Sequence, residues 1–503
     1  MKSDANLPDG ASRRDLLKAA AASSLAFGSH RPPIRSESPI AAENRKPGTR
    51  EWINTKVEVD PETKYRSRRI EGYVSHTSIL PGESLDFFVS TNPGVRFEIR
   101  LYRLGYYQGL GGRLVHSMGP FQGAPQPEPP IGPKRLRECE WQSCARLRIP
   151  DDWLSGVYVG QLTAGDEGWQ SYVIFVVRDE RAADFVFQCS DHTWSAYNRW
   201  PSQFALYDDG EKPWYWGPDV AVSFDRPFGK YCQIFDAPLS VGSGEFLLWE
   251  YPLAFWMEQN GYDVTYIANG DTHARPETLR RTKAFLSVGH DEYWSLAMYR
   301  NVKQAIDAGV NVAFLSGNAV CGVVDVQPSA RGSAYRVIER VGLFGGVDDT
   351  AEGFPDMRRL TQHGPSEGLL IGARNAYPLT GGGDWICRLP EHWLFAGTGM
   401  KAGDSIPGLV GWEWHGDPTP LAGLEVVASG PTSNGSKDKG EYAATLYPGP
   451  KGNLVFNAST IWWGDGLSEP PGYIRPAVYT KPLGPDARVQ RITRNLFDRF
   501  LSH

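Results

Sequence analysis

The chain has 503 residues, of which 41% are hydrophobic and 22% are charged, and these values are typical of a globular protein with two or three domains. Its 52 basic and 58 acidic residues give a net charge of -6 and form no long block of one sign. The charge pattern therefore argues against nucleic acid or a membrane surface as a partner.

The N-terminus has the form of a twin-arginine export signal. Arg13 and Arg14 precede a short apolar stretch, rich in alanine, that ends near Gly28. This stretch is much shorter than the roughly 20 residues that a membrane span requires. We therefore predict that residues 1–46 are a signal peptide and linker, that the mature protein has no membrane span, and that it is periplasmic or extracellular. The alternative is a chance Arg-Arg pair before an alanine-rich helix.

The six cysteines are too few for a disulfide framework in a chain of this length, and their spacing supplies no zinc ligand set. Cys139 and Cys144 are close enough in sequence to pair in an oxidising compartment, and the sequence leaves open whether they do. The other four lie in or beside apolar runs, which is typical of small buried residues.

Residues 47–180 are predicted to form an immunoglobulin-like β-sandwich. Six segments between Ile70 and Val177 are rich in β-branched and aromatic residues, and several alternate strictly between apolar and polar positions. Turn signals such as Pro81-Gly82 separate them, and six or seven short strands of this kind are typical of a sandwich. Because ionisable residues do not gather in this part of the chain, we interpret it as a structural or docking module.

Residues 181–503 are predicted to form an α/β domain. Two short apolar runs of strand length, 185–189 and 284–288, are each followed by a dense polar cluster. The second cluster, His290-Asp-Glu-Tyr293, precedes an amphipathic helix that ends at Gly309, and a further apolar strand follows. This arrangement places ionisable residues at the carboxyl ends of strands, where open α/β sheets bind ligands.

The passage between Arg199 and Glu245 is long, aromatic and rich in glycine and proline, and it shows no periodicity of its own. Loops of this length in a compact domain tend to be functional, so we expect it to cover the polar clusters. After Gly322 the sequence predicts further strands and a closing amphipathic helix around residues 489–500.

The candidate functional residues come from the two polar clusters and one later apolar run: His290, Glu292, His192, Tyr197 and Glu413. A histidine and a carboxylate that converge can serve as general acid and base, as metal ligands, or as both. A histidine held by structural hydrogen bonds would give the same pattern. The chain lacks the Gly-x-Ser-x-Gly, His-Glu-x-x-His and Gly-x-x-x-x-Gly-Lys motifs, and no cysteine occupies the nucleophile position at the strand end.

The run Gly289-His-Asp-Glu-Tyr-Trp-Ser295 resembles the large (beta) subunit of N,N-dimethylformamidase and its relatives. Further similar segments are Thr193 to Asn198, Trp249 to Pro252, Gly261 to Val264 and Ser316 to Asn318, so that the likeness covers roughly residues 65–470. It implies a glutaminase-like (flavodoxin-like) α/β domain joined to β-sandwich parts. It also implies a hydrolase of the C–N bond of small amides or formamides that uses one iron ion, Fe3+, held by two tyrosines and one glutamate.

Carried onto this chain, the resemblance makes Glu292 the carboxylate ligand of the iron and His290 its acid or base neighbour. Tyr197 matches one tyrosine ligand, and Glu413 matches a further active-site glutamate. Tyr231 is the candidate for the second tyrosine. Near it, Phe228 stands where relatives are expected to have a tyrosine, which leaves the complete metal site open.

Two function classes remain at this point. The first is a metal-dependent amide hydrolase that acts on a small-molecule substrate. The second is a non-catalytic periplasmic protein that binds a glycan or a surface and keeps the fold. Because the chain is shorter than the characterised large subunit, a homo-oligomer and a small partner subunit both stay open.

Overall fold

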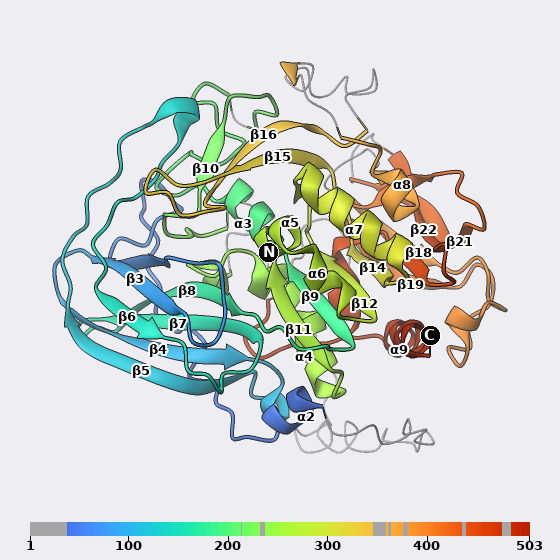
Figure 1. Cartoon of the computed structure of the whole chain (residues 1–503), viewed down its shortest axis with the longest axis horizontal. Helices are drawn as coiled ribbons and strands as arrows, with labels where there is room; N and C mark the ends of the chain where they lie inside the picture. The colour runs from blue at the N-terminus through green and yellow to red at the C-terminus, as the bar shows by residue number, and fades with distance from the viewer. Residues whose placement is uncertain are drawn as a thin grey trace, which may run out of the picture. The chain divides into compact units, whose positions relative to one another are not determined.

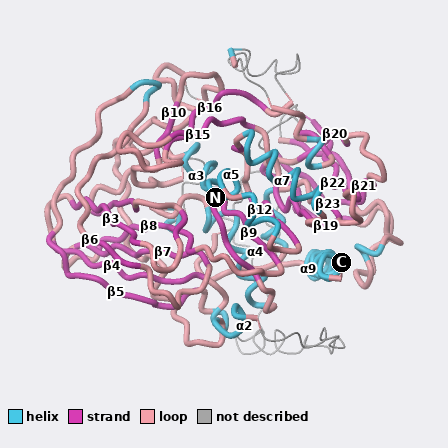
Figure 2. Tube along the Cα trace, in the orientation of Figure 1, coloured by secondary structure: helices cyan, strands magenta, loops and turns pink. Residues whose placement is uncertain are grey.

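The computed structural model of the protein describes residues 38–212, 214–231, 237–345, 359–360, 364–375, 381–434, 439–474 and 484–502. The predicted twin-arginine signal and Cys232 lie outside these residues. From Pro39 onward the chain forms one compact unit, and it combines helices with several β-sheets, which confirms the mixed α/β class (Figure 1, Figure 2). Within the described ranges, none of the helices is both long and apolar enough to cross a bilayer.

Two sheets built before residue 180 share one hydrophobic core. The five-stranded sheet has the order β2 (Ser78–Ile79), β8 (Trp169–Val177), β7 (Gly156–Ala164), β4 (Arg96–Leu104) and β5 (Gly112–Gln122). The three-stranded sheet has the order β1 (Ile70–Val74), β3 (Ser84–Thr91) and β6 (Ala145–Arg148). All neighbouring strands are antiparallel except β2 and β8.

Strand β4 shows how the sequence produces this packing. Its side chains alternate, with Phe97, Ile99 and Leu101 buried and the charged residues between them exposed at the start of the strand. Because successive side chains of a strand point to opposite faces, the apolar set enters the core between the sheets. Nearby, Cys139 and Cys144 are free thiols and do not form a disulfide.

A nine-stranded sheet forms the centre of the remaining chain. Its order is β11 (Val264–Ala268), β9 (Phe185–Cys189), β12 (Ala284–Gly289), β14 (Asn311–Ser316), β23 (Leu454–Asn457), β22 (Lys439–Pro448), β21 (Glu425–Ser433), β18 (Gly381–Ile386) and β19 (Ser405–Trp412). The first five strands are parallel and the others join them in antiparallel fashion. The strand predicted over 284–288 is β12, whose carboxyl end meets that of its neighbour β9.

Helices cover both faces of the parallel strands. On one face α7 (Leu296–Ala308) packs with α6 (Pro276–Arg280) against alternate residues of β12 and β14. On the other face α4 (Tyr251–Gln259) and α9 (Ala487–Leu501) pack against the intervening residues. The shorter helices are α2 (Pro39–Glu43), α3 (Asp191–Tyr197), α5 (Asn269–Ala274) and α8 (Gly368–Ile371).

The long aromatic passage after Arg199 is not wholly irregular. It contains β10 (Ala221–Ser223), which pairs with β16 (Val337–Leu343) in a four-stranded sheet that continues through β15 (Gly322–Gln327) to β13 (Tyr293–Trp294). Figure 1 shows β10, β15 and β16 on the side of α3. A two-stranded sheet pairs β17 (Ala373–Asn375) with β20 (His415–Pro418).

Six short helical segments complete the described elements. Five are 3-10 turns and one, η4, is a π-turn: η1 (Tyr107–Gly109), η2 (Pro133–Arg135), η3 (Pro238–Ser240), η4 (Phe246–Glu250), η7 (Trp393–Phe395) and η8 (Ile461–Gly466). The π-turn leads directly into α4, so Glu245 stands at its start, close to the end of β12.

Candidate active site

The polar turn after β12 owes its shape to a glycine and a cap. Gly289 has φ 67° and a Cβ there would lie 2.8 Å from the Cβ of Trp249, so only glycine fits. The turn then forms β13, and the hydroxyl of Ser295 accepts the amide hydrogen bond of Met298 to begin α7. His290 and Glu292 are thereby held between two regular elements.

Two phenols converge on the carboxylate of Glu292. The hydroxyl of Tyr197, at the end of α3, donates to Oε2 over 2.8 Å. The hydroxyl of Tyr207 lies 3.0 Å from Oε1 and 2.8 Å from the Tyr197 oxygen. All three side chains are buried. Burial, and after it the charge of Glu292, raises the pKa of both tyrosines well above that of an ordinary phenol.

His290 lies among three glutamates. Its Nε2 is 2.9 Å from Oε2 of Glu413 and 3.2 Å from Oε2 of Glu292, and its Nδ1 is 3.5 Å from Oε2 of Glu245. All four side chains are buried. Burial by itself would lower the pKa of His290, but the charge of Glu413 and the contacts with the other two carboxylates raise that pKa well above its ordinary value. The raised pKa favours the protonated, cationic form of the imidazole among these acidic groups.

Glu413 reaches His290 from a different part of the sheet. It follows β19, and the amide nitrogen of the Asn318 side chain donates to its Oε2 over 3.0 Å. Asn318 follows β14 after Gly317, where a Cβ would lie only 2.1 Å from the carbonyl oxygen of Glu413. The close approach of the two turns therefore requires a glycine at position 317.

The structure places the predicted site residues as follows. Tyr197, His290, Glu292 and Glu413 come together in one buried cluster. The ring of Tyr231 lies beside that of Tyr197, with centroids 6.1 Å apart. Its role as the second ligand stays a prediction.

His192 is buried on α3, with Nδ1 3.3 Å from the carbonyl oxygen of Tyr293. Burial lowers the pKa of His192 to about 3. This histidine is therefore neutral, and its backbone contact indicates a structural role.

Sequence reasoning assigns no functional role to three residues of the cluster: Tyr207, Glu245 and Tyr293. Tyr207 and Glu245 lie in or at the end of the aromatic passage that was expected to cover the polar clusters. That expectation was the only signal for them, because a passage without periodicity does not indicate which side chains point inward.

The donor set suits a hard metal ion. Two phenol oxygens and a carboxylate meet in a buried space, and hard anionic oxygens of this kind bind cations such as ferric iron. In the part of the chain that the structure describes, no group of three or more His, Cys, Asp and Glu side chains could by itself hold a metal ion. The fit therefore depends on the tyrosines.

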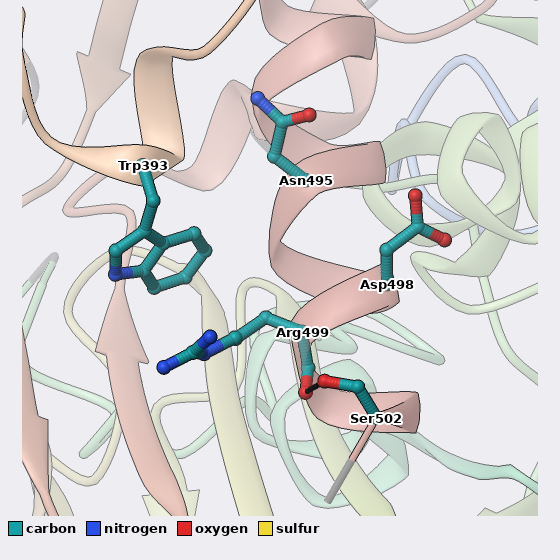
Figure 3. A pocket seen from close by; sticks show the side chains of 5 residues that line it. All are labelled: Trp393, Asn495, Asp498, Arg499 and Ser502. Carbon is teal, nitrogen blue, oxygen red and sulfur yellow. Dashed lines mark hydrogen bonds between the residues drawn. The ribbon is translucent and has the colours of Figure 1, made fainter. Parts of the chain in front are cut away.

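A separate hollow of about 280 Å³ lies on the surface beside α9. Figure 3 shows its lining residues: Trp393, Asn495, Asp498, Arg499 and Ser502. None of them belongs to the cluster around Glu292, and the guanidinium of Arg499 stacks over the Trp393 ring at 5.6 Å. The hollow therefore has no part in the candidate site.

Comparisons with known proteins agree with the resemblance noted in the sequence. The family model described as N,N-dimethylformamidase beta subunit-like, C-terminal, matches residues 98–475, a range that includes the whole cluster. No curated protein matches the chain. Among solved structures, a β-D-glucuronidase from Dictyoglomus thermophilum aligns over 53% of this chain and 57% of the glucuronidase chain, at 9% identity and a TM-score of only 0.12. The chain belongs to the N,N-dimethylformamidase beta subunit-like family.

Proposed function

We propose that the protein is an iron-dependent hydrolase of the C–N bond of small amides or formamides. The observation that carries this proposal is the meeting of two phenols with Glu292 directly beside the His290–Glu413 pair. The oxygen donors for a metal and the groups that donate and accept protons then lie in one buried place, as amide hydrolysis requires.

The residues that would hold the iron are Glu292, Tyr197 and Tyr207. Tyr207 is preferred to Tyr231 because its hydroxyl contacts both oxygens of Glu292, at 3.0 and 3.1 Å. Ferric iron bound there would act as a Lewis acid toward an amide carbonyl or would lower the pKa of a bound water.

His290 and Glu413 would move the protons of the reaction. Glu413 accepts a proton from the attacking water, and the amine that leaves must gain one, which His290 can supply because Nε2 lies 2.9 Å from that carboxylate. Glu245 faces Nδ1 on the other side of the ring and so keeps Nε2 directed toward the two catalytic carboxylates. Asn318 holds Glu413 in place through its amide.

The arrangement of domains and the location of the protein form part of the same proposal. The two sheets before residue 180 would be an immunoglobulin-like sandwich, and the nine-stranded sheet with its helices would be a glutaminase-like domain.

Residues 1–46 would direct export by the twin-arginine route, which carries folded proteins. A reporter fused to these residues should be exported, and Arg13→Lys with Arg14→Lys should stop its export.

The test combines metal content, colour and turnover. The purified protein should contain iron, absorb visible light as ferric tyrosinates do, and release formate from N,N-dimethylformamide. Tyr207→Phe should lower iron affinity by more than the 10–100-fold that changes outside the ligand set typically cause, whereas Tyr231→Phe should not. A colourless protein that binds no iron and hydrolyses no amide would contradict the proposal. Loss of iron only in Tyr231→Phe would reverse the ligand assignment.

A further inference from the structure

A buried arginine stands behind one of the two phenols. Arg340 on β16 has no exposed surface. It donates to backbone carbonyls on the passage that carries Tyr207: Leu206 at 2.8 Å, Tyr215 at 2.8 Å and Gly217 at 3.0 Å. Its remaining terminal nitrogen, Nη1, donates to the hydroxyl of Tyr293 over 3.1 Å.

The charge of Arg340 faces the candidate metal site. Its guanidinium carbon lies 5.2 Å from the centroid of the Tyr207 ring. Within the described part of the chain it forms no ion pair with a carboxylate. A buried charge is costly unless an opposite charge compensates it. Hydrogen bonds through the hydroxyls of Tyr293 and Tyr207 link Arg340 to the carboxylate of Glu292.

The two phenols at Glu292 are therefore not equivalent. The oxygen of Tyr207 accepts a hydrogen bond from the hydroxyl of Tyr293 over 2.8 Å, and Arg340 polarises that hydroxyl from behind. Among the described residues, Tyr197 has neither a hydrogen bond from Tyr293 nor a contact with Arg340, and its hydroxyl bonds only to Tyr207 and Glu292.

We propose that Tyr293 and Arg340 are positioning residues that orient the Tyr207 oxygen toward the metal and reduce its electron donation relative to Tyr197. This inference rests on the proposed function. Once the Tyr207 oxygen binds a cation and loses its proton, it can only accept hydrogen bonds, and Tyr293 already donates one to it. The positive charge of Arg340 then lies beside the new phenolate and stabilises it.

The test compares Tyr293→Phe and Arg340→Gln with two controls. Arg226→Gln removes another buried arginine that donates to backbone carbonyls, at Trp200 and Phe204 of the same passage and at Ser195 and Asn198 beside Tyr197, without a contact to a phenol of the cluster among its described bonds. Tyr447→Phe removes a buried phenol that donates to the carbonyl of Leu370. The readouts are iron affinity, measured by competition with a chelator, and the wavelength of the visible tyrosinate band.

Each test variant should lower iron affinity by about 10–100-fold and move the band to longer wavelength, because a phenolate that lacks the hydrogen bond gives up electron density more easily. Arg340→Lys, which keeps the charge, should show a smaller shift than Arg340→Gln. The controls should leave the band in place. If the Arg340 variants do not fold, Tyr293→Phe, which removes a single oxygen, decides alone.

The two proposals fail in different ways. A wild-type protein without iron or a visible band overturns both. A wild-type protein that has the band, together with a Tyr293→Phe variant of unchanged band and unchanged iron affinity, overturns only the inference about Tyr293 and Arg340. A band shift of equal size in Arg226→Gln would also overturn it, since the shift would then follow from loosening the passage.

Discussion

Two buried glutamates accept hydrogen bonds from phenols but meet opposite electrostatic surroundings. Glu258 on α4 receives two hydrogen bonds from the guanidinium of Arg103, each of 2.9 Å. It also accepts from the side chain of Asn44 at 2.7 Å and from the hydroxyl of Tyr266 at 3.0 Å. The negative charge is thereby matched by a full positive charge, and both partners are buried.

Around Glu292 the same kind of carboxylate has no such partner. Its donors are the hydroxyls of Tyr197 and Tyr207, and His290 is shared with Glu245 and Glu413. Among the described residues, no lysine or arginine forms an ion pair with these three glutamates. A buried ion pair with balanced charge is costly to break on one side only, whereas an excess of buried acid favours a bound cation or a mobile proton.

The largest expected effect comes from Glu292→Gln. This variant should lose iron and amide turnover, with an affinity loss beyond the roughly 100-fold typical of residues outside the ligand set. Its melting temperature without metal should stay the same or rise, because the change removes one charge from an acid-rich cluster. Elemental analysis, a turnover assay and thermal unfolding measure the three quantities. Iron bound at wild-type strength would contradict the role given to Glu292.

His290→Asn should lower turnover by about 10²–10⁴-fold, the usual contribution of a general acid or base. Iron content and the visible band should persist, because the imidazole moves protons and is not assigned as a ligand. Steady-state kinetics and absorption spectra check both points. Loss of the band together with turnover would instead assign His290 to the metal.

Glu258→Gln tests the other half of the comparison. It should destabilise the protein by about 3–5 kcal/mol, because the change leaves Arg103 as a buried charge without its partner. Denaturant unfolding measures the loss. Iron bound per folded molecule should match the wild type. If Glu258→Gln lowered iron affinity as much as Glu292→Gln does, the distinction between the two networks would be lost.

The smallest effect concerns pH and a histidine that has no carboxylate partner. Nε2 of His415 accepts the backbone amide of Ala319 at 3.0 Å, and Nδ1 lies 2.9 Å from Oδ1 of Asn457. Burial lowers the pKa of His415 to about 4. Since the unfolded chain binds the proton near pH 6.5, this histidine contributes stability above that pH which is lost as the pH falls to 4.

The loss through His415 amounts to about 3 kcal/mol. His415→Gln should remove this part of the acid destabilisation, so its unfolding free energy should fall less between pH 7 and pH 4.5 than that of the wild type. Urea unfolding at both pH values provides the measurement. Equal slopes for the two proteins would show that folding does not lower the pKa of His415.

Much of the central unit could be predicted because its signals are local. The apolar run at 284–288 has the length of a buried strand, and the helix that follows ends at Gly309, which has φ 102°. Tyr207 could not be predicted in the same way, because it lies in a passage without periodicity and its direction depends on the carbonyls that Arg340 binds. The approach of Glu413 to His290 depends on the strand order of the sheet, which local patterns do not specify.

The backbone contact between the turns at Gly317 and Glu413 sets the distance between the proton donor His290 and the proton acceptor Glu413. A methyl group at position 317 would overlap the carbonyl oxygen of residue 413 and would move the two loops apart. Gly317→Ala could therefore inactivate the protein while every reactive side chain is retained. Within this family, relatives with a larger residue at that position should be expected to have a different spacing between the histidine and the glutamate, and with it a different reactivity.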